Sequence, residues 1–176
     1  CAYRPLNVEA IDLDCNALGL NLESPVLICA GAPMKYAPNH DSVFVKIAKQ
    51  LGRCQFVFFN HFKENLSAKL QQRLDAAFLD ADMYFSEYAV YLPWLKREAF
   101  YGLMMRSDVY LDTIGFSGFN TAMQAVECGL PIVAWERRFI RGRLASGILK
   151  RMGLAELGAH TNDEYSALVV QLGTDE

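Results

Sequence analysis

The sequence contains no apolar run approaching the ~20 residues that a membrane-spanning helix requires. It also lacks the basic and then apolar amino-terminal segment that directs secretion. The net charge is only −3, without the basic balance typical of nucleic-acid binding; one local exception is an arginine cluster, Arg137, Arg138, Arg141 and Arg143. We therefore expect a cytoplasmic protein that binds neither nucleic acid nor membranes.

Motifs for thiol, metal and hydrolytic chemistry are also missing. The cysteines number 5, an odd count, and form no C-x-x-C pair, which favours reduced core thiols over disulfides. The histidines His40, His61 and His160 form no H-x-x-x-H or H-E-x-x-H pattern, so we expect no metal and no other cofactor. Ser117 lacks a G-x-S-x-G context, which disfavours a hydrolytic nucleophile.

The two commonest phosphate motifs are absent as well. There is no G-x-x-x-x-G-K-[ST], which disfavours a P-loop nucleotidase, and no G-x-G-x-x-G after the first predicted strand, which disfavours a dinucleotide fold. With 176 residues, of which 52% are hydrophobic and 21% charged, the chain suits one globular domain. It starts at Cys1 without methionine, so we expect it to be a piece of a longer polypeptide.

Short apolar runs alternate with segments of helical periodicity. The runs show no polar alternation, as is typical of strands covered on both faces: Val26–Ala30, Phe56–Phe59, Tyr88–Leu92, Val109–Leu111 and Ile132–Trp135. The first predicted helix begins after a cap at Asn39 or Asp41 and ends at Gly52. The other predicted helices span Leu66–Leu79, Lys96–Arg106, Asn120–Cys128, Arg143–Met152 and Asn162–Leu172. The last of them opens with a capping box from Thr161 to Glu164. This order predicts an α/β fold, a Rossmann-like parallel sheet with helices on both faces. Residues 1–24 fit less well and suggest a strand or a small hairpin.

The stretch from Asp108 to Glu136 is the most informative. It reads as a buried strand, a loop containing Gly115 and Gly118, a helix that opens near Asn120, and a second buried strand. Glycines let the backbone approach a ligand, and the free N–H groups at a helix start bind anions, most often phosphate. A purely structural loop is an equally open interpretation.

Further candidates follow the other strands, because ligands of such sheets bind at the carboxyl ends of the strands. Residues at these ends are Gly31 to Lys35, Asn60 and His61, Pro93 to Arg97, Thr113 to Thr121, and Glu136 to Arg138. Lys35 can reach a phosphate or can be a solvated loop lysine. Arg97 and Phe100, three residues apart on one helical face, can flank a planar base, or they can be surface and core respectively. Asp112 can orient its loop or take part in chemistry, and the structural role is favoured.

Several motifs in order resemble one family. Two runs of this sequence are similar to the catalytic lobe of the SPINDLY and O-linked N-acetylglucosamine transferase family. They are L-P-W-L-K-R-E-A-F-Y-G-L-M-M-R-S-D-V-Y-L-D-T-I-G-F-S-G-F-N-T-A-M-Q-A-V-E-C-G-L-P-I-V and, after it, R-G-R-L-A-S-G-I-L-K-R-M-G-L-A-E-L. The resemblance covers roughly Val26 to the C-terminus. It implies the C-terminal half of a GT-B fold, with residues 26–176 as the UDP-sugar-binding domain and residues 1–25 leading in from a preceding domain.

The resemblance also implies roles for individual residues. Lys35 stands where the family binds the donor phosphate, and we assign it the catalytic role. Leu95 through its backbone, with Arg97 and Phe100, stands at the uracil. The remaining implied UDP-binding residues are Ser117, Gly118, Phe119, Asn120, Thr121 and Gln124.

This sequence departs from the family pattern at three of these positions. Phe100 replaces a histidine beside the uracil, Phe119 replaces the histidine of the G-H-T-T loop, and Gln124 replaces the acid that grips the ribose. Glutamine still forms hydrogen bonds, without the assistance of a charge.

The resemblance implies an inverting glycosyltransferase lobe. Its partners would be a UDP-sugar donor (UDP-GlcNAc, or UDP-glucose as in the related adhesin N-glycosyltransferases), a protein or glycan acceptor, and the N-terminal GT-B lobe of the same polypeptide. Because that lobe supplies part of the machinery, the fragment alone is expected to bind donor without turnover. The main alternative is a degenerate lobe that acts as a non-catalytic interaction module, and a UDP-sugar epimerase fits the motif series less well.

Overall fold

A single parallel sheet forms the centre of the protein. The computed structural model describes residues 3–5, 7–62 and 64–174. The sheet has 6 strands in the order β3-β2-β1-β4-β5-β6. Its strands are β1 (Val26–Cys29), β2 (Gln55–Phe59), β3 (Ala89–Leu92), β4 (Val109–Leu111), β5 (Ile132–Trp135) and β6 (Gly158–Ala159). All neighbouring strands are parallel, which confirms the predicted Rossmann-like fold.

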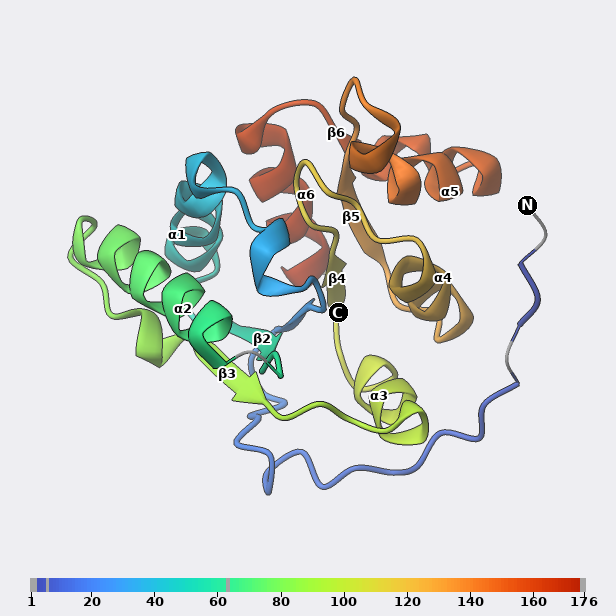
Figure 1. Cartoon of the computed structure of the whole chain (residues 1–176), viewed down its shortest axis with the longest axis horizontal. Helices are drawn as coiled ribbons and strands as arrows, with labels where there is room; N and C mark the ends of the chain where they lie inside the picture. Colours follow the sequence, from blue (N-terminus) through green and yellow to red (C-terminus); the bar gives the residue numbers. More distant parts are fainter. Residues whose placement is uncertain (1–2, 6, 63, 175–176) are drawn as a thin grey trace.

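Six longer helices cover the two faces of this sheet. They are α1 (Asp41–Leu51), α2 (Glu64–Leu79), α3 (Arg97–Met104), α4 (Asn120–Glu127), α5 (Leu144–Met152) and α6 (Asn162–Thr174). Figure 1 shows α1, α2 and α6 on one side of the sheet and α3, α4 and α5 on the other. The apolar core is divided in the same way, into one cluster under each set of helices. The strands are therefore buried on both faces, as their unbroken apolar runs predicted.

The predicted elements are confirmed with small shifts at their ends. No predicted strand is displaced by more than a residue, and Gly52 caps the carboxyl end of α1 with a φ of 69°, which suits glycine. The predicted cap of α1 is wrong, because within the described chain no side chain caps this helix. The capping box is confirmed: the Glu164 N–H donates to Thr161 Oγ1 (3.1 Å), and Glu164 Oε2 accepts from the His160 N–H (2.7 Å).

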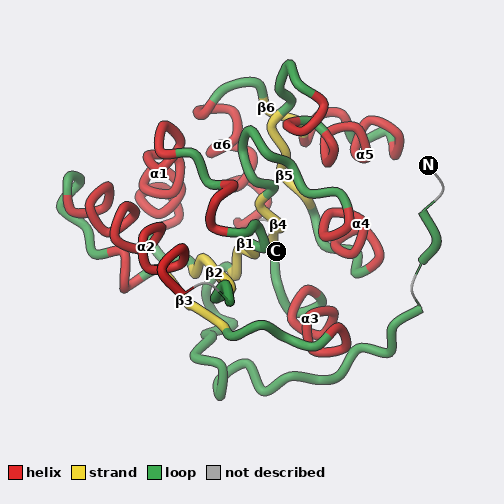
Figure 2. Tube along the Cα trace, viewed as in Figure 1, coloured by secondary structure: helices red, strands yellow, loops and turns green. Residues whose placement is uncertain are grey.

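The amino-terminal segment differs from its prediction. Residues 3–5 and 7–25 form turns and extended chain but no strand or hairpin, so that expectation is wrong for the described residues. The Figure 2 tube shows them as a loop that runs past α3. Cys15 and Leu20 are buried in the core beneath α3, and the Ile11 N–H donates to the Glu98 carbonyl (3.3 Å). This segment covers one side of the domain.

The described cysteines are free thiols, as the sequence predicted. Cys15, Cys29 and Cys54 are buried free thiols, Cys128 is half-buried and free, and Cys1 lies outside the described residues. Burial raises the pKa of Cys54 to about 12, so it stays protonated at neutral pH.

In the part of the chain that the structure describes, none of the helices has the length and apolar character needed to cross a bilayer.

Candidate functional site

The strand order creates a cleft at the carboxyl edge of the sheet. β1 connects through α1 to β2 on one side, whereas β4 leads through α4 to β5 on the other, so the loops after β1 and β4 diverge. Ligands of open α/β sheets bind at this switch point. A cleft of about 460 Å³ lies beside it, within the ~300–1,000 Å³ of small-molecule sites. It is lined by Ala30, Gly31, Phe59, Asn60, His61, Trp94, Leu95, Lys96, Arg97, Phe100, Thr121 and Gln124.

Half of the predicted site residues meet in this cleft. Leu95, Arg97 and Phe100 come from the start of α3, while Thr121 and Gln124 come from the first turns of α4. The Phe100 ring packs edge-on against Phe59, with centroids 5.5 Å apart, and still faces the cleft. Phe100 is thus partly core and partly cleft wall.

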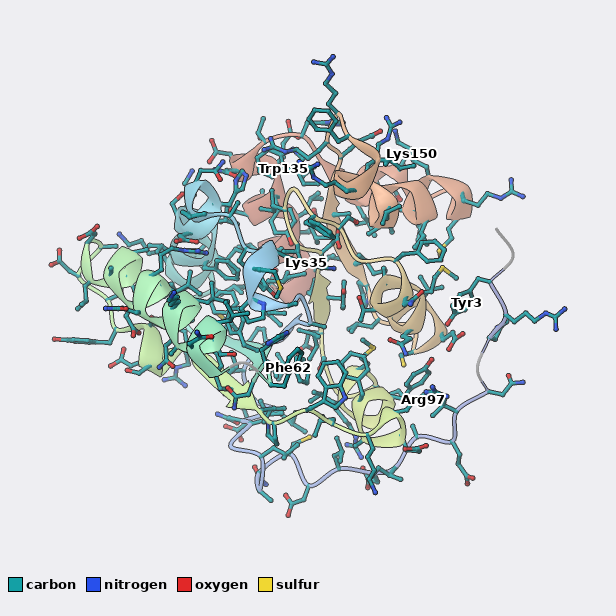
Figure 3. All side chains as sticks on the ribbon, in the orientation of Figure 1. Tyr3, Lys35, Phe62, Arg97, Trp135 and Lys150 are labelled. Atoms are coloured by element: carbon teal, nitrogen blue, oxygen red, sulfur yellow. The ribbon has the colours of Figure 1, made fainter. Side chains whose placement is uncertain are left out.

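The other predicted residues are not among those that line the cleft. Ser117 and Gly118 form the loop that leads into α4, and Phe119 and Asn120 begin that helix. Lys35 ends the short helical turn Pro33–Lys35 after β1. Its Nζ lies over the ring of Phe116, 4.8 Å from the centroid, so a loop residue of β4 holds the lysine beside the glycine loop. In Figure 3, Lys35 lies near the centre of the view, between Trp135 and Phe62.

The glycine loop is fixed by hydrogen bonds from beneath. Gly115 has a φ of 88°, which requires glycine there. The Gly118 N–H donates to Asp112 Oδ1 (2.7 Å), and the Ser117 N–H donates to the Arg141 carbonyl (2.7 Å). These two amides are therefore engaged within the protein, and Gly118 contributes close packing: an added Cβ would lie 2.7 Å from Thr121 Oγ1.

The first turn of α4 remains open to a ligand. Among the described residues, no side chain caps this helix, so its first N–H groups are not satisfied by a cap. The Thr121 hydroxyl hydrogen-bonds the buried Tyr110 hydroxyl (2.7 Å), which fixes the side chain at the cleft wall. Free N–H groups at a helix start carry a partial positive charge that favours anions.

The cleft lining also includes residues to which the sequence assigned no role, among them Gly31, Asn60, His61 and Trp94. Gly31 lies at the switch point, and an added Cβ would meet Thr113 Oγ1 at 2.2 Å, so only glycine lets the loops after β1 and β4 approach so closely. Asn60 and His61 follow β2, where the strand-end rule placed them without a function. Trp94 is 84% exposed at the cleft. The signal in the sequence that could have identified it was a tryptophan shortly before a predicted helix.

The sequence of this domain matches one family over most of its length. The model of glycosyl transferase family 41 matches residues 38–176. The chain belongs to this family. The predicted resemblance is thereby confirmed.

Relatives within the family are much longer than this chain. It is 38% identical over 69 residues to a UDP-N-acetylglucosamine–peptide N-acetylglucosaminyltransferase of Caenorhabditis elegans, a match covering 39% of this chain and 6% of that protein. It is 33% identical over 75 residues to a probable SPINDLY enzyme of Petunia hybrida, covering 43% of this chain and 8% of that protein. The chain thus corresponds to a small part of these relatives.

Solved structures share the fold. An O-GlcNAc transferase mutant of Thermobaculum terrenum aligns with a TM-score of 0.78 at 24% identity, covering 98% of this chain and 31% of that one. A UDP-GlcNAc 2-epimerase of Neisseria meningitidis bound to UDP-GlcNAc aligns with a TM-score of 0.55 at 16% identity, covering 85% and 35%. These similarities support the fold class, the C-terminal half of a GT-B fold.

Asp112 supports the glycine loop of this family 41 domain from within the core. Its side chain is 2% exposed, and burial raises its pKa from the ordinary 3.8 to about 6, although hydrogen bonds from Ser117, Gly118 and Thr113 oppose the rise. Its carbonyl also accepts a hydrogen bond from the Tyr165 hydroxyl (2.8 Å). The structural role favoured for Asp112 therefore fits these contacts.

The raised pKa of Asp112 predicts an unusual pH dependence of stability. A carboxyl whose pKa is higher when folded favours folding in its protonated form, so the contribution of Asp112 to the free energy of unfolding should be fully present below about pH 4 and be lost as the pH rises to about 6. The loss from this one group is about 3 kcal/mol at 1.36 kcal/mol per pKa unit. Urea unfolding across this pH range should show a flatter profile for Asp112→Asn than for the wild type. The exposed Asp80→Asn control should keep the wild-type profile.

Proposed function

We propose that the chain is the donor-binding lobe of an inverting glycosyltransferase that uses a UDP-sugar. The observation that carries this proposal is the convergence of a base-sized cleft at Arg97 and Phe100 with an uncapped helix start at α4 and a lysine at its border. The nucleoside would occupy the cleft, and the diphosphate would lie at α4. Family membership over residues 38–176 supports the same function.

Each part of the donor has a candidate partner. Phe100 and Arg97 would flank the uracil, and the backbone of Leu95 would read its edge. Gln124 lies one turn after Asn120 on α4 and lines the cleft, where it would hydrogen-bond the ribose. The N–H groups at Phe119, Asn120 and Thr121 would bind the diphosphate with Lys35.

The chemical role of this lobe is to stabilise the leaving group. In an inverting transfer, the acceptor nucleophile forms a bond to the anomeric carbon as the bond to the β-phosphate oxygen breaks. Negative charge then grows on UDP, where the Lys35 ammonium and the α4 amides can stabilise it without a metal. A helix terminus contributes only about 0.3–1 kcal/mol at exposed sites, so we expect Lys35 to dominate.

The remaining partners follow from the two-lobe architecture. The sugar would be N-acetylglucosamine or glucose, and the acceptor a protein or glycan. An N-terminal lobe of the same polypeptide would supply the general base and part of the acceptor site, so this chain alone would bind donor without turnover. We place the protein in the cytoplasm.

The experiment is a transfer assay of the full-length protein with a panel of UDP-sugars and with peptide and glycan acceptors, read by mass spectrometry. We expect one donor to add a single sugar mass to an acceptor. The absence of transfer from every UDP-sugar, together with partner binding that survives Lys35→Ala, would instead support a non-catalytic interaction module. Phe119 and Gln124, at positions where the family has a histidine and an acid, motivate that alternative.

A further inference from the structure

A second cavity lies beside the donor cleft and is strongly basic. It measures about 480 Å³, and we call it the basic pocket; its lining is Met34, Lys35, Ala37, Asn39, His40, Ile114, Gly115, Phe116, Arg137, Arg138, Phe139 and Arg141. This lining includes Lys35 and three arginines but no aspartate or glutamate. The pocket occupies the loops after β1, β4 and β5, whereas the donor cleft occupies those after β1, β2 and β3 and the start of α4.

The cations of the basic pocket form no salt bridge among the described residues, although Lys35 interacts electrostatically with the buried carboxyl of Asp112. Among the described residues, the ion pairs are Lys46–Asp163, Arg73–Asp41, Arg106–Asp12 and Lys150–Glu136, and none involves Lys35 or the three arginines of the pocket. Unpaired cations around a concave surface raise the local concentration of anions. Within the part of the chain that the structure describes, its three arginines therefore have no carboxylate partner.

Arg137 is held in place by neutral groups. Its guanidinium lies over the Trp135 ring, 4.7 Å from the centroid, and its Nη2 donates to His40 Nε2 (3.3 Å). The Nδ1–H of His40 donates to Asn162 Oδ1 (3.0 Å), which leaves Nε2 as the acceptor. Burial, and then Arg137 itself, lower the pKa of His40, so it is neutral at pH 7 and does not compete for an anion.

The other two arginines flank an exposed ring. Arg138 and Arg141 lie 5.9 and 5.3 Å from the centroid of Phe139, which is 62% exposed. The loop is fixed at both ends, since the Arg137 N–H donates to the Gly142 carbonyl (3.2 Å) and the Arg141 carbonyl accepts from Ser117 (2.7 Å). The last bond joins the basic pocket to the glycine loop.

The geometry points to the basic pocket as the site that binds an acidic peptide segment of the acceptor. This inference rests on the proposed transferase function. Guanidinium groups bind carboxylates in paired hydrogen bonds, and the rings of Phe116 and Phe139 between the cations provide apolar contact for a peptide. The volume is in the ~300–1,000 Å³ range of larger ligands and exceeds the need of a single ion.

The position of the pocket suits an acceptor rather than the donor. The basic pocket and the nucleoside cleft share no lining residue, so an occupant of one does not fill the other. With Lys35 engaged by the diphosphate, the three arginines remain for a second anion. An acidic segment held there would lie next to the departing phosphate and the sugar attached to it.

The test is fluorescence anisotropy with a short fluorescein-labelled Glu–Ser peptide, in the presence and absence of saturating UDP. We expect the peptide to bind the UDP-loaded chain, and an otherwise identical Gln–Ser peptide not to bind. Arg138→Gln combined with Arg141→Gln should weaken peptide binding about fivefold to thirtyfold, as two charge pairs of ~0.5–1 kcal/mol each imply. Arg53→Gln combined with Arg151→Gln removes the same charge from exposed sites elsewhere and should leave binding unchanged.

Other outcomes would overturn the inference. Equal binding of the Glu and Gln peptides, an equal loss in both double variants, or displacement of the peptide by UDP would each contradict an acceptor site. Binding of inorganic phosphate without the peptide would make it a small-anion site. Calorimetry with UDP on the same samples keeps the two proposals apart: UDP binding without peptide binding rejects only this inference, while peptide binding without UDP binding rejects the donor site. Thermal unfolding by circular dichroism verifies that each variant is folded.

Discussion

Lys35→Ala is expected to weaken the binding of UDP by about tenfold to hundredfold, because a charge-assisted hydrogen bond contributes ~1.5–3 kcal/mol. Lys35 ends the turn Pro33–Lys35, and its ammonium lies over the ring of Phe116, in the loop that leads toward α4. Isothermal titration calorimetry measures the effect. In the full-length enzyme, the same change should lower kcat as well.

The matched control is Lys69→Ala, which removes an exposed lysine from α2. It should leave UDP affinity unchanged. Equal affinity of the Lys35→Ala variant and the wild type would show that the diphosphate does not lie at α4 and Lys35.

Gly118→Ala is expected to impair both the fold and the donor site. Its new Cβ would lie 2.7 Å from Thr121 Oγ1 and 3.2 Å from the Tyr110 hydroxyl oxygen. These two oxygen atoms are hydrogen-bonded to each other. Overpacking of this kind costs about 1–3 kcal/mol of unfolding free energy. Because the loop must shift to relieve the contact, the first turn of α4 moves too, and UDP binding should weaken at least about tenfold.

Gly147→Ala makes the same chemical change as Gly118→Ala, but we expect it to raise stability and to leave the donor site unchanged. Gly147 lies in α5, and an added Cβ there meets nothing within 4 Å. This variant should be more stable by about 0.5–1 kcal/mol, with unchanged UDP binding. If urea unfolding and calorimetry gave Gly118→Ala the same behaviour, the tight packing of the glycine loop would not matter for the site.

The central strands and helices could be predicted because their sequence signals are local. The strands β1 and β4 are short apolar runs bounded by turn residues, and α1 has its apolar residues on one face. The strand β6 was missed because its two residues, Gly158 and Ala159, carry no β propensity and pair only through β5. The amino-terminal segment was misjudged because its structure depends on packing against α3.

The candidate site, too, has features that local sequence signals predicted and contacts that only the fold reveals. The uncapped start of α4 and the cleft face at Arg97 and Phe100 follow from spacing and from family resemblance. Contacts between distant segments do not: the Gly118 N–H is satisfied by Asp112, and Arg137 is oriented by His40 from another loop. The arginine cluster was visible in the sequence, but its place beside Lys35 required the fold.

Calorimetric titration of the chain with UDP decides whether this lobe binds UDP across the switch point. We expect saturable binding to a single site at submillimolar UDP, weakened by Lys35→Ala and unchanged by Lys69→Ala. No detectable heat of binding at millimolar UDP, from a chain shown by circular dichroism to be folded, would contradict it.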